Sequence, residues 1–141
     1  MKSNRIAISS ALMIVALVGS ARAAGPVPTI PFTAQQAAQG KLAYIRACSR
    51  CHGGNLEGSV AIPSLNPGFI QRWQGGDLDS AIDYIRYAMP LDKPGTLDQP
   101  TGVAIMAYML RVNGYEPGPS PMPTERAALK EIPLLPYPAG Q

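Results

Sequence analysis

The chain has 141 residues, of which 46% are hydrophobic and only 15% are charged. This length corresponds to one domain and excludes a large multidomain enzyme, and the high apolar content excludes a disordered chain. The formal net charge is +3, but the basic excess lies in the N-terminal segment described next, so it gives no support to nucleic-acid binding.

The N-terminal segment has the pattern of an export signal. Lys2 and Arg5 precede an apolar run over residues 6–18, and an Ala-x-Ala cleavage site ends at Ala23. The apolar run is shorter than the roughly 20 residues that a membrane-spanning helix needs. We therefore expect a signal peptide over residues 1–23 that is cleaved after Ala23, with an uncleaved anchor as the alternative. No transmembrane segment is expected after cleavage, and the exported chain would carry nine basic and nine acidic residues.

The first predicted helix follows a short extended leader. Residues 24–32 contain three prolines, which favour extended backbone. Thr33 followed by Gln36 fits a capping box and opens a helix that we expect to run to about Arg50. Gly40 inside this helix is unfavourable by roughly 0.5–1 kcal/mol relative to alanine, which indicates that another backbone comes close there. A tolerated surface glycine is the alternative.

The two cysteines and the single histidine of the chain fall within one pentapeptide, Cys48-Ser49-Arg50-Cys51-His52. A thioredoxin-like redox pair would need a strand before the motif, whereas the preceding residues have a helical pattern. A structural zinc site would need a further ligand. The third interpretation is covalent attachment of a c-type haem, for which C-x-x-C-H is the signature. Both thiols would then bind the porphyrin as thioethers, and the imidazole of His52 would lie under the iron.

The middle of the chain predicts a long loop and then a second helix. Residues 53–76 have no good periodicity, and a loop of this length is unusual in a compact domain unless it covers something such as a haem face. Asp77 is the expected cap of the second helix, whose apolar residues follow the helical template. This helix should end before Pro90, because the residue before a proline is disfavoured in helical geometry.

The third predicted helix is the most apolar part of the chain outside the N-terminal segment. Asp98 or Thr96 opens it, and residues 103–112 are apolar on two faces. We expect one face to pack on the first helix at Gly40 and the other to face the haem. Residues 113–114, Asn-Gly, are its predicted C-terminal stop.

The C-terminal part is rich in proline and predicts a tail rather than a second domain. Residues 33–115 form the predicted globular domain, and residues 116–141 form an extended tail in which residues 124–131 make a short helical turn. We expect the tail to bury little and to contact a partner protein. The alternative is a tail that packs on its own domain through apolar residues such as Ile132 and Leu134.

Together these features resemble a monohaem class I cytochrome c over residues 32–118. A helix with Gly40 and Tyr44 leads into the haem motif, a proline-containing loop follows, and then come residues 84–90 (YIRYAMP) and a helix containing residues 107–110 (AYML). The resemblance implies an all-α fold of three or more helices wrapped around one haem c, held covalently through the two cysteines.

Residues 89–97 and 113–118 resemble a narrower group of exported cytochromes, the electron-accepting subunits of periplasmic dehydrogenases of quinoprotein alcohol or sulfite and sulfur-compound type. This resemblance implies a periplasmic one-electron carrier, not an enzyme, that takes electrons from such a dehydrogenase. It would pass them to a downstream cytochrome or oxidase of the respiratory chain. The alternative is a haem enzyme or ligand-binding protein, a peroxidase or gas binder, with a labile methionine ligand. The lack of a second histidine counts against that alternative.

The resemblance also implies Met89 as the second axial ligand of the iron. The placement agrees, because Met89 lies at a helix end fixed by Pro90 and could cross the far face of the haem. Ligation by histidine and methionine fills both axial positions and suits electron transfer. Met106 and Met109 are the rivals, but methionines within an apolar helix are more often core residues.

Two further residues are candidates for contact with the haem or its ligand. The second ring nitrogen of His52 needs an acceptor, and in the family a backbone carbonyl at a proline of the following loop serves, for which Pro63 is the match. The indole of Trp73 could donate to a haem propionate, with core packing as the alternative. Arg72 could pair with the same propionate or remain a solvated charge.

Overall fold

The computed structural model describes residues 29–136, so the predicted signal peptide, most of the leader and the last five residues lie outside it. Within this range the chain is helical and has no strand, only an isolated β-bridge between Asp77 and Pro133. The all-α class predicted from the sequence is confirmed. No helix of the described range has the length and apolar character to cross a membrane. The helices are α1 (Ala34–Ala47), α2 (Ser49–His52), α3 (Gly68–Trp73), α4 (Leu78–Ala88), α5 (Gln99–Val112) and α6 (Arg126–Lys130).

Helix α1 begins with the capping box that the sequence predicts. The Thr33 hydroxyl accepts a hydrogen bond from the backbone N–H of Gln36, and the Gln36 side-chain oxygen accepts one from the backbone N–H of Thr33, both at 3.1 Å. The helix ends at Ala47 rather than near Arg50, because the backbone leaves helical geometry at Cys48 (φ −125°) before α2 starts.

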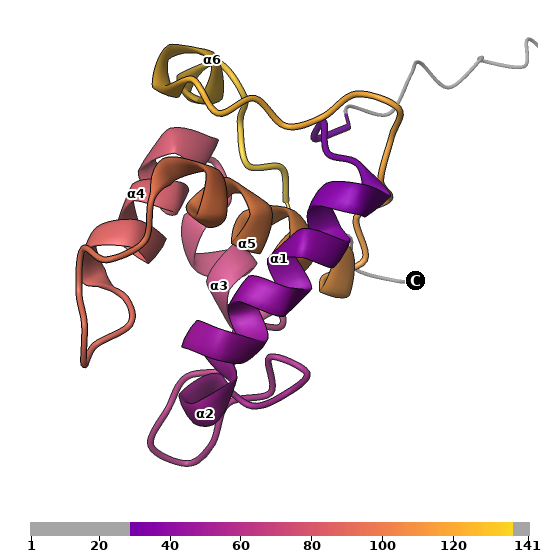
Figure 1. The fold of residues 1–141 in the computed structure, drawn as a ribbon. Coiled ribbons are helices and arrows are strands. Elements are labelled where there is room, and N and C mark those ends of the chain that lie inside the picture. The colour runs from indigo at the N-terminus through magenta and orange to yellow at the C-terminus, as the bar shows by residue number, and fades with distance from the viewer. Residues whose placement is uncertain (1–28, 137–141) are drawn as a thin grey trace, which may run out of the picture.

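The closest helix contact in the fold is the crossing of α1 and α5, seen in Figure 1 as the indigo and orange helices. A Cβ atom placed on Gly40 would lie only 1.8 Å from the carbonyl oxygen of Ala104. The predicted backbone approach at Gly40 is therefore confirmed. Beside the crossing, the rings of Tyr44 and Tyr108 lie 5.2 Å apart.

Helix α4 also begins where the sequence predicts. The Asp77 carboxylate accepts a hydrogen bond from the backbone N–H of Ser80 at 2.8 Å. Helical geometry ends before Met89, whose backbone is extended, as expected for the residue preceding Pro90. The predicted apolar face of the helix is buried and consists of Leu78, Ala81, Ile82 and Ile85.

Helix α5 is capped by Asp98 rather than Thr96, since Asp98 Oδ1 accepts a hydrogen bond from the backbone N–H of Thr101 at 2.9 Å. The helix is buried over both predicted faces, which places it in the centre of the fold. Its last residue is Val112, Asn113 is its C-cap, and Gly114 follows with φ +84°.

Two predictions about the remaining segments are wrong. The expected loop over residues 53–76 contains helix α3, which lacks a side-chain cap and is too short to show periodicity. The expectation that the tail buries little is wrong, and the alternative of a tail packed on its own domain is confirmed, because Met122, Leu129 and Leu134 are at most 2% exposed. It returns to the domain through α6, which contacts α4, and the predicted helical turn within residues 124–131 is thereby confirmed.

Candidate functional site

All the residues predicted to bind the haem except Trp73 line one cavity of about 800 Å³, a size within the roughly 300–1,000 Å³ typical of cofactor sites. Cys48, Cys51, His52, Met89 and Pro63 all line it. The walls come from the end of α1, from α2, from the loop before α3, and from α3, α4 and α5 together with the segment that joins α4 to α5. The apolar part of the lining includes Tyr44, Leu65, Phe69, Ile85, Ile105 and Met109.

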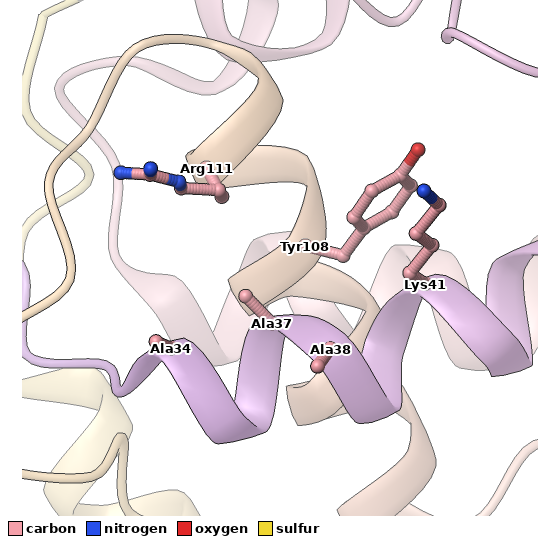
Figure 2. A pocket seen from close by; sticks show the side chains of 6 residues that line it. All are labelled: Ala34, Ala37, Ala38, Lys41, Tyr108 and Arg111. Atoms are coloured by element: carbon pink, nitrogen blue, oxygen red, sulfur yellow. The ribbon is translucent and has the colours of Figure 1, made fainter.

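A second hollow, of about 290 Å³, lies between α1 and α5. Figure 2 shows its alanine floor beside the side chains of Lys41, Tyr108 and Arg111. None of the predicted ligands lines this hollow. The chemistry that the sequence indicates is therefore concentrated in the larger cavity, which we call the main cavity.

The haem motif reaches the main cavity through a single helical turn. The backbone N–H groups of Cys51 and His52 both donate to the carbonyl oxygen of Cys48, at 3.1 and 2.9 Å. In such a turn, residues three and four apart share one side. Cys48 and Cys51 therefore lie on the same side of the turn. Cys48 is half-buried at the end of α1, and Cys51 is exposed.

The thiol of Cys48 is poorly suited to disulfide exchange. Burial, with a contribution from the neighbouring Cys51, raises its pKa to about 11. Redox-active cysteines instead have lowered pKa values, because the thiolate is the reacting form. Within residues 29–136 there is also no group of three histidine, cysteine or acidic side chains arranged to hold a metal ion, so this range supplies no zinc ligand set.

The imidazole of His52 has one nitrogen held and one nitrogen available. Its Nδ1 lies 3.0 Å from the carbonyl oxygen of Pro63. A carbonyl oxygen only accepts hydrogen bonds, so Nδ1 is the donor, and Nε2 is the ring nitrogen left for a ligand role. This arrangement fixes the ring and its tautomer, as is common for histidines that ligate metals.

The loop after His52, residues 53–67, is held by backbone hydrogen bonds and by side chains of several residues, and we call it the proximal loop. The carbonyl oxygen of His52 accepts a hydrogen bond from Gly58 N–H, and the carbonyl oxygen of Leu56 accepts one from Leu65 N–H, both at 2.8 Å. Side chains add further bonds, from the Tyr44 hydroxyl to the carbonyl oxygen of Gly53 at 2.8 Å and from Asn113 Nδ2, at the C-cap of α5, to the carbonyl oxygen of Leu65 at 3.2 Å. Sequence reasoning treated Asn113 only as a helix stop and did not assign it this role.

Another part of the cavity wall begins at Met89. Its extended backbone leads from α4 into residues 90–98, which we call the distal segment. Pro90, Leu91 and Leu97 of this segment also line the cavity. Of the two rival methionines, Met109 lines the main cavity, whereas Met106 is fully buried and does not.

Trp73 packs behind the main cavity rather than lining it. Its ring centroid lies 6.1 Å from that of Phe69 and 5.4 Å from that of Tyr84, and both of these residues do line the cavity. The indole Nε1 is buried with no hydrogen-bond partner in the structure. A buried N–H without an acceptor is unfavourable by about 1–3 kcal/mol, so an acceptor supplied by a bound group would fit here.

The charges around the main cavity suit an anionic occupant. Its lining includes four basic side chains and one acidic side chain, namely Arg46, Arg50, Arg72 and Lys93 against Asp92. Haem is mostly apolar and carries two carboxylates. The apolar walls, the two thiols, the available Nε2 of His52, the unpaired indole N–H and the basic lining therefore match that cofactor.

Comparison with protein families gives one match. A model of the family described as Cytochrome C oxidase, cbb3-type, subunit III matches residues 35–109, slightly more than half of the chain. The match runs from the start of α1 to near the end of α5, so it spans the haem motif and Met89 and omits the tail. Searches of curated proteins and of solved structures gave no match.

Proposed function

The chain belongs to the family described as cytochrome c oxidase, cbb3-type, subunit III, and we propose that it holds one haem c covalently through Cys48 and Cys51. It is a c-type cytochrome with a small class I cytochrome c fold, and its role is electron transfer. When bound, the haem supplies a reversible one-electron couple at its iron. The observation that carries the proposal is the single cavity onto which both cysteines, His52 and Met89 open.

His52 and Met89 would hold the iron from two parts of the cavity wall. His52 would bind through Nε2, with its ring fixed by the hydrogen bond from Nδ1 to the Pro63 carbonyl oxygen, and Met89 would bind through its sulfur. Ligation by histidine and methionine would leave no iron position for a substrate and would raise the reduction potential. Arg72 on the cavity wall and Trp73 Nε1 behind it would donate to the propionates.

We further propose that the protein acts in the periplasm, after cleavage of its signal following Ala23. It accepts electrons from a periplasmic dehydrogenase of quinoprotein alcohol or sulfite and sulfur-compound type and passes them to the respiratory chain. The export pattern and the motifs at residues 89–97 and 113–118 support this proposal. The description of the family names an oxidase subunit, which supports an oxidase branch as the destination of the electrons.

Mass spectrometry of protein purified from a host that matures c-type cytochromes tests the haem proposal. We expect the mass of the chain from Ala24 plus one haem, retained in denaturant. Replacing either Cys48 or Cys51 with alanine should leave one thioether bond, and replacing both should leave none. A colourless wild-type protein with the mass of the chain without haem would overturn the proposal. A mass that includes residues 1–23 together with haem would overturn only the predicted cleavage of the signal.

The proposed role as an electron acceptor from a dehydrogenase is tested by a reduction assay and by a ligand-binding assay. We expect the oxidised protein to be reduced when mixed with a quinoprotein alcohol dehydrogenase or a sulfite dehydrogenase and its substrate, and the faster of the two identifies the donor class. Failure with both classes would overturn the dehydrogenase partner while leaving the cytochrome assignment intact. If the wild-type protein bound cyanide or imidazole readily at the iron, the haem-enzyme alternative with a labile Met89 would replace electron transfer.

A further inference from the structure

Arg86 lies three residues before Met89. It contacts the C-terminal part of the distal segment and the helices on either side of that segment in the chain, α4 and α5. We infer that Arg86 is the positioning residue for Met89: its side chain fastens the distal segment to α4 and α5, and so keeps the methionine sulfur on the iron. This inference rests on the proposed ligation by Met89. Nothing in the haem motif or in the match to the family assigns a role to this arginine.

The guanidinium of Arg86 connects three separate groups. Its Nε donates to the carbonyl oxygen of Leu97 at 3.2 Å, and its Nη1 donates to Gln99 Oε1 at 2.5 Å and to Asp83 Oδ1 at 3.2 Å. The backbone carbonyl of Arg86 accepts a hydrogen bond from Gly95 N–H at 3.1 Å. One residue of α4 thus holds the returning end of the distal segment and the first turn of α5.

The aliphatic part of the Arg86 side chain packs directly against Gly102, where a residue with a Cβ atom would clash with it. A Cβ atom on Gly102 of α5 would lie 2.7 and 2.8 Å from the Arg86 Cγ and Cδ atoms. The guanidinium carbon lies 4.9 Å from the centre of the Tyr87 ring, and the side chain is only 14% exposed. Hydrogen bonds in such a shielded place are stronger than the same bonds in water.

The remaining bonds of the distal segment contribute less to its attachment. The bonds from Lys93 N–H to the Pro90 carbonyl and from the Thr96 hydroxyl to the Lys93 carbonyl lie within the segment and fix its internal shape. At its tip, Asp92 pairs with Arg50, but these side chains are 54% and 81% exposed. Exposed ion pairs of this kind contribute little to stability. The attachment to the helices therefore depends on the side-chain bonds of Arg86, together with the backbone bond from Gly95 N–H to the Arg86 carbonyl.

The Arg86 contacts also extend to the tail. Asp83 accepts hydrogen bonds from both Arg86 and Arg126, and Arg126 in addition makes two bonds of 3.0 Å to the buried carboxylate of Asp79. Helix α6 thereby holds in place one of the acceptors that orient the Arg86 guanidinium. This connection gives the tail a role in the position of the distal segment.

The test compares Arg86→Gln with Arg111→Gln in the haem-loaded protein. Arg111 lies on α5 beside the smaller hollow of Figure 2 and pairs with the exposed Glu116, so the control removes an equal charge without touching the distal segment. Imidazole binds only where Met89 has left the iron, so its apparent affinity follows the fraction of open molecules. For Arg86→Gln we expect roughly tenfold tighter imidazole binding and faster amide exchange over residues 90–98. The sulfur-to-iron absorption should disappear at a lower temperature than the helical signal.

Arg111→Gln should match the wild type in all three measurements. If Arg86→Gln also matched it, the positioning role would be overturned while the haem assignment stood. If instead the wild-type protein itself lacked covalent haem or the sulfur-to-iron absorption, the proposed function would be the part that failed.

A second variant separates positioning from folding. Gly102→Ala keeps the guanidinium, but the added Cβ atom displaces the Arg86 Cγ and Cδ atoms. We therefore expect smaller changes of the same kind in imidazole affinity, in amide exchange over residues 90–98 and in the temperature at which the sulfur-to-iron absorption is lost. Arg86→Lys keeps the charge and the aliphatic part of the side chain but not the several N–H donors of the guanidinium. It replaces Arg86→Gln in the test if that variant does not assemble with haem. Wild-type imidazole affinity and wild-type exchange in either of these variants would contradict the inference.

Discussion

The two walls of the main cavity are held in different ways. The proximal loop has several independent supports, namely the backbone bonds from Gly58 N–H to the His52 carbonyl and from Leu65 N–H to the Leu56 carbonyl, and side-chain bonds from Tyr44 and Asn113. The distal segment instead depends on the side chain of Arg86. No single substitution removes all the supports of the proximal loop, whereas one substitution can remove every side-chain bond of Arg86 and leave only the backbone bond from Gly95 N–H to the Arg86 carbonyl. We therefore expect the proximal loop with His52 to stay in place, and the distal segment with Met89 to move away from the cavity first.

The largest expected effect comes from the tail, which supports the distal side through α4. Truncation after Gly118 removes three buried apolar side chains, Met122, Leu129 and Leu134. At about 1.5–3 kcal/mol each, their loss is comparable to the roughly 5–15 kcal/mol that stabilises a whole domain. It also removes Arg126 and leaves the carboxylate of Asp79, 2% exposed, without its cation. Thermal unfolding followed by circular dichroism should show a large fall in melting temperature or no cooperative transition.

A matched pair of leucine substitutions sharpens this prediction. Leu129→Ala, at a fully buried position of α6, should lower the free energy of unfolding by about 2–5 kcal/mol. Leu42→Ala, at a position of α1 that is 58% exposed, should change it by about 0.5 kcal/mol or less. An unchanged melting temperature after truncation would instead support a tail that serves only to contact a partner.

The next largest effect is expected at the distal ligand. Met89→Ala should abolish the sulfur-to-iron absorption of the oxidised protein, lower the reduction potential and allow small ligands to bind. Met106→Leu, a volume-conserving change in the core, should leave all three properties unchanged. If the absorption survived Met89→Ala but disappeared in Met109→Leu, Met109 would be the ligand. Optical spectroscopy and redox titration measure these outcomes.

A smaller effect is expected where the proximal loop does depend on residue type. Gly58 has φ +69°, and a Cβ atom there would lie 2.5 Å from the Ile62 carbonyl oxygen. Gly58→Ala should therefore destabilise the protein by about 1–3 kcal/mol in chemical denaturation. Gly54→Ala, where a Cβ atom meets nothing within 4 Å, is the control. Imidazole affinity should stay at the wild-type value, and tighter binding would contradict the contrast between the two walls.

The parts of the fold that the sequence could predict are those set by neighbouring residues. The caps at Thr33, Asp77 and Asp98 bond to residues three positions away, so short patterns reveal them. The haem motif is equally local. Gly40 was a usable signal because a glycine inside a helix is unfavourable unless something requires it.

The parts that could not be predicted depend on residues distant in the chain. The Leu134 backbone bonds to Gly75 and Gly76, and Arg126 reaches Asp79, but no local pattern connects these positions. No pattern in the sequence alone assigns a role to Arg86. Its role emerges only when α5 places Gly102 against its stem.

The smallest expected effect concerns acid, and it compares one carboxylate from each wall. Hydrogen bonds from the Thr101 hydroxyl and then the Thr101 backbone N–H lower the pKa of Asp98, which ends the distal segment and caps α5. In the proximal loop, hydrogen bonds from its own backbone N–H and that of Asn55 lower the pKa of Glu57. A carboxyl group whose pKa is lower in the folded protein stabilises the fold above its unfolded pKa. That stabilisation is lost as the pH falls through the folded pKa.

Both contributions should therefore be present at neutral pH and disappear below about pH 4. Asp98 also lies at the N-terminus of a long helix, where the helix dipole favours the charged form, whereas Glu57 binds only amides of its own loop. Asparagine caps helices nearly as well as aspartate, so Asp98→Asn should change stability little at neutral pH and flatten its decline in acid. Glu57→Gln should flatten that decline less. Urea unfolding midpoints at neutral pH and near pH 3.5 measure the difference, and a larger change for Glu57→Gln would show that acid acts first on the proximal wall.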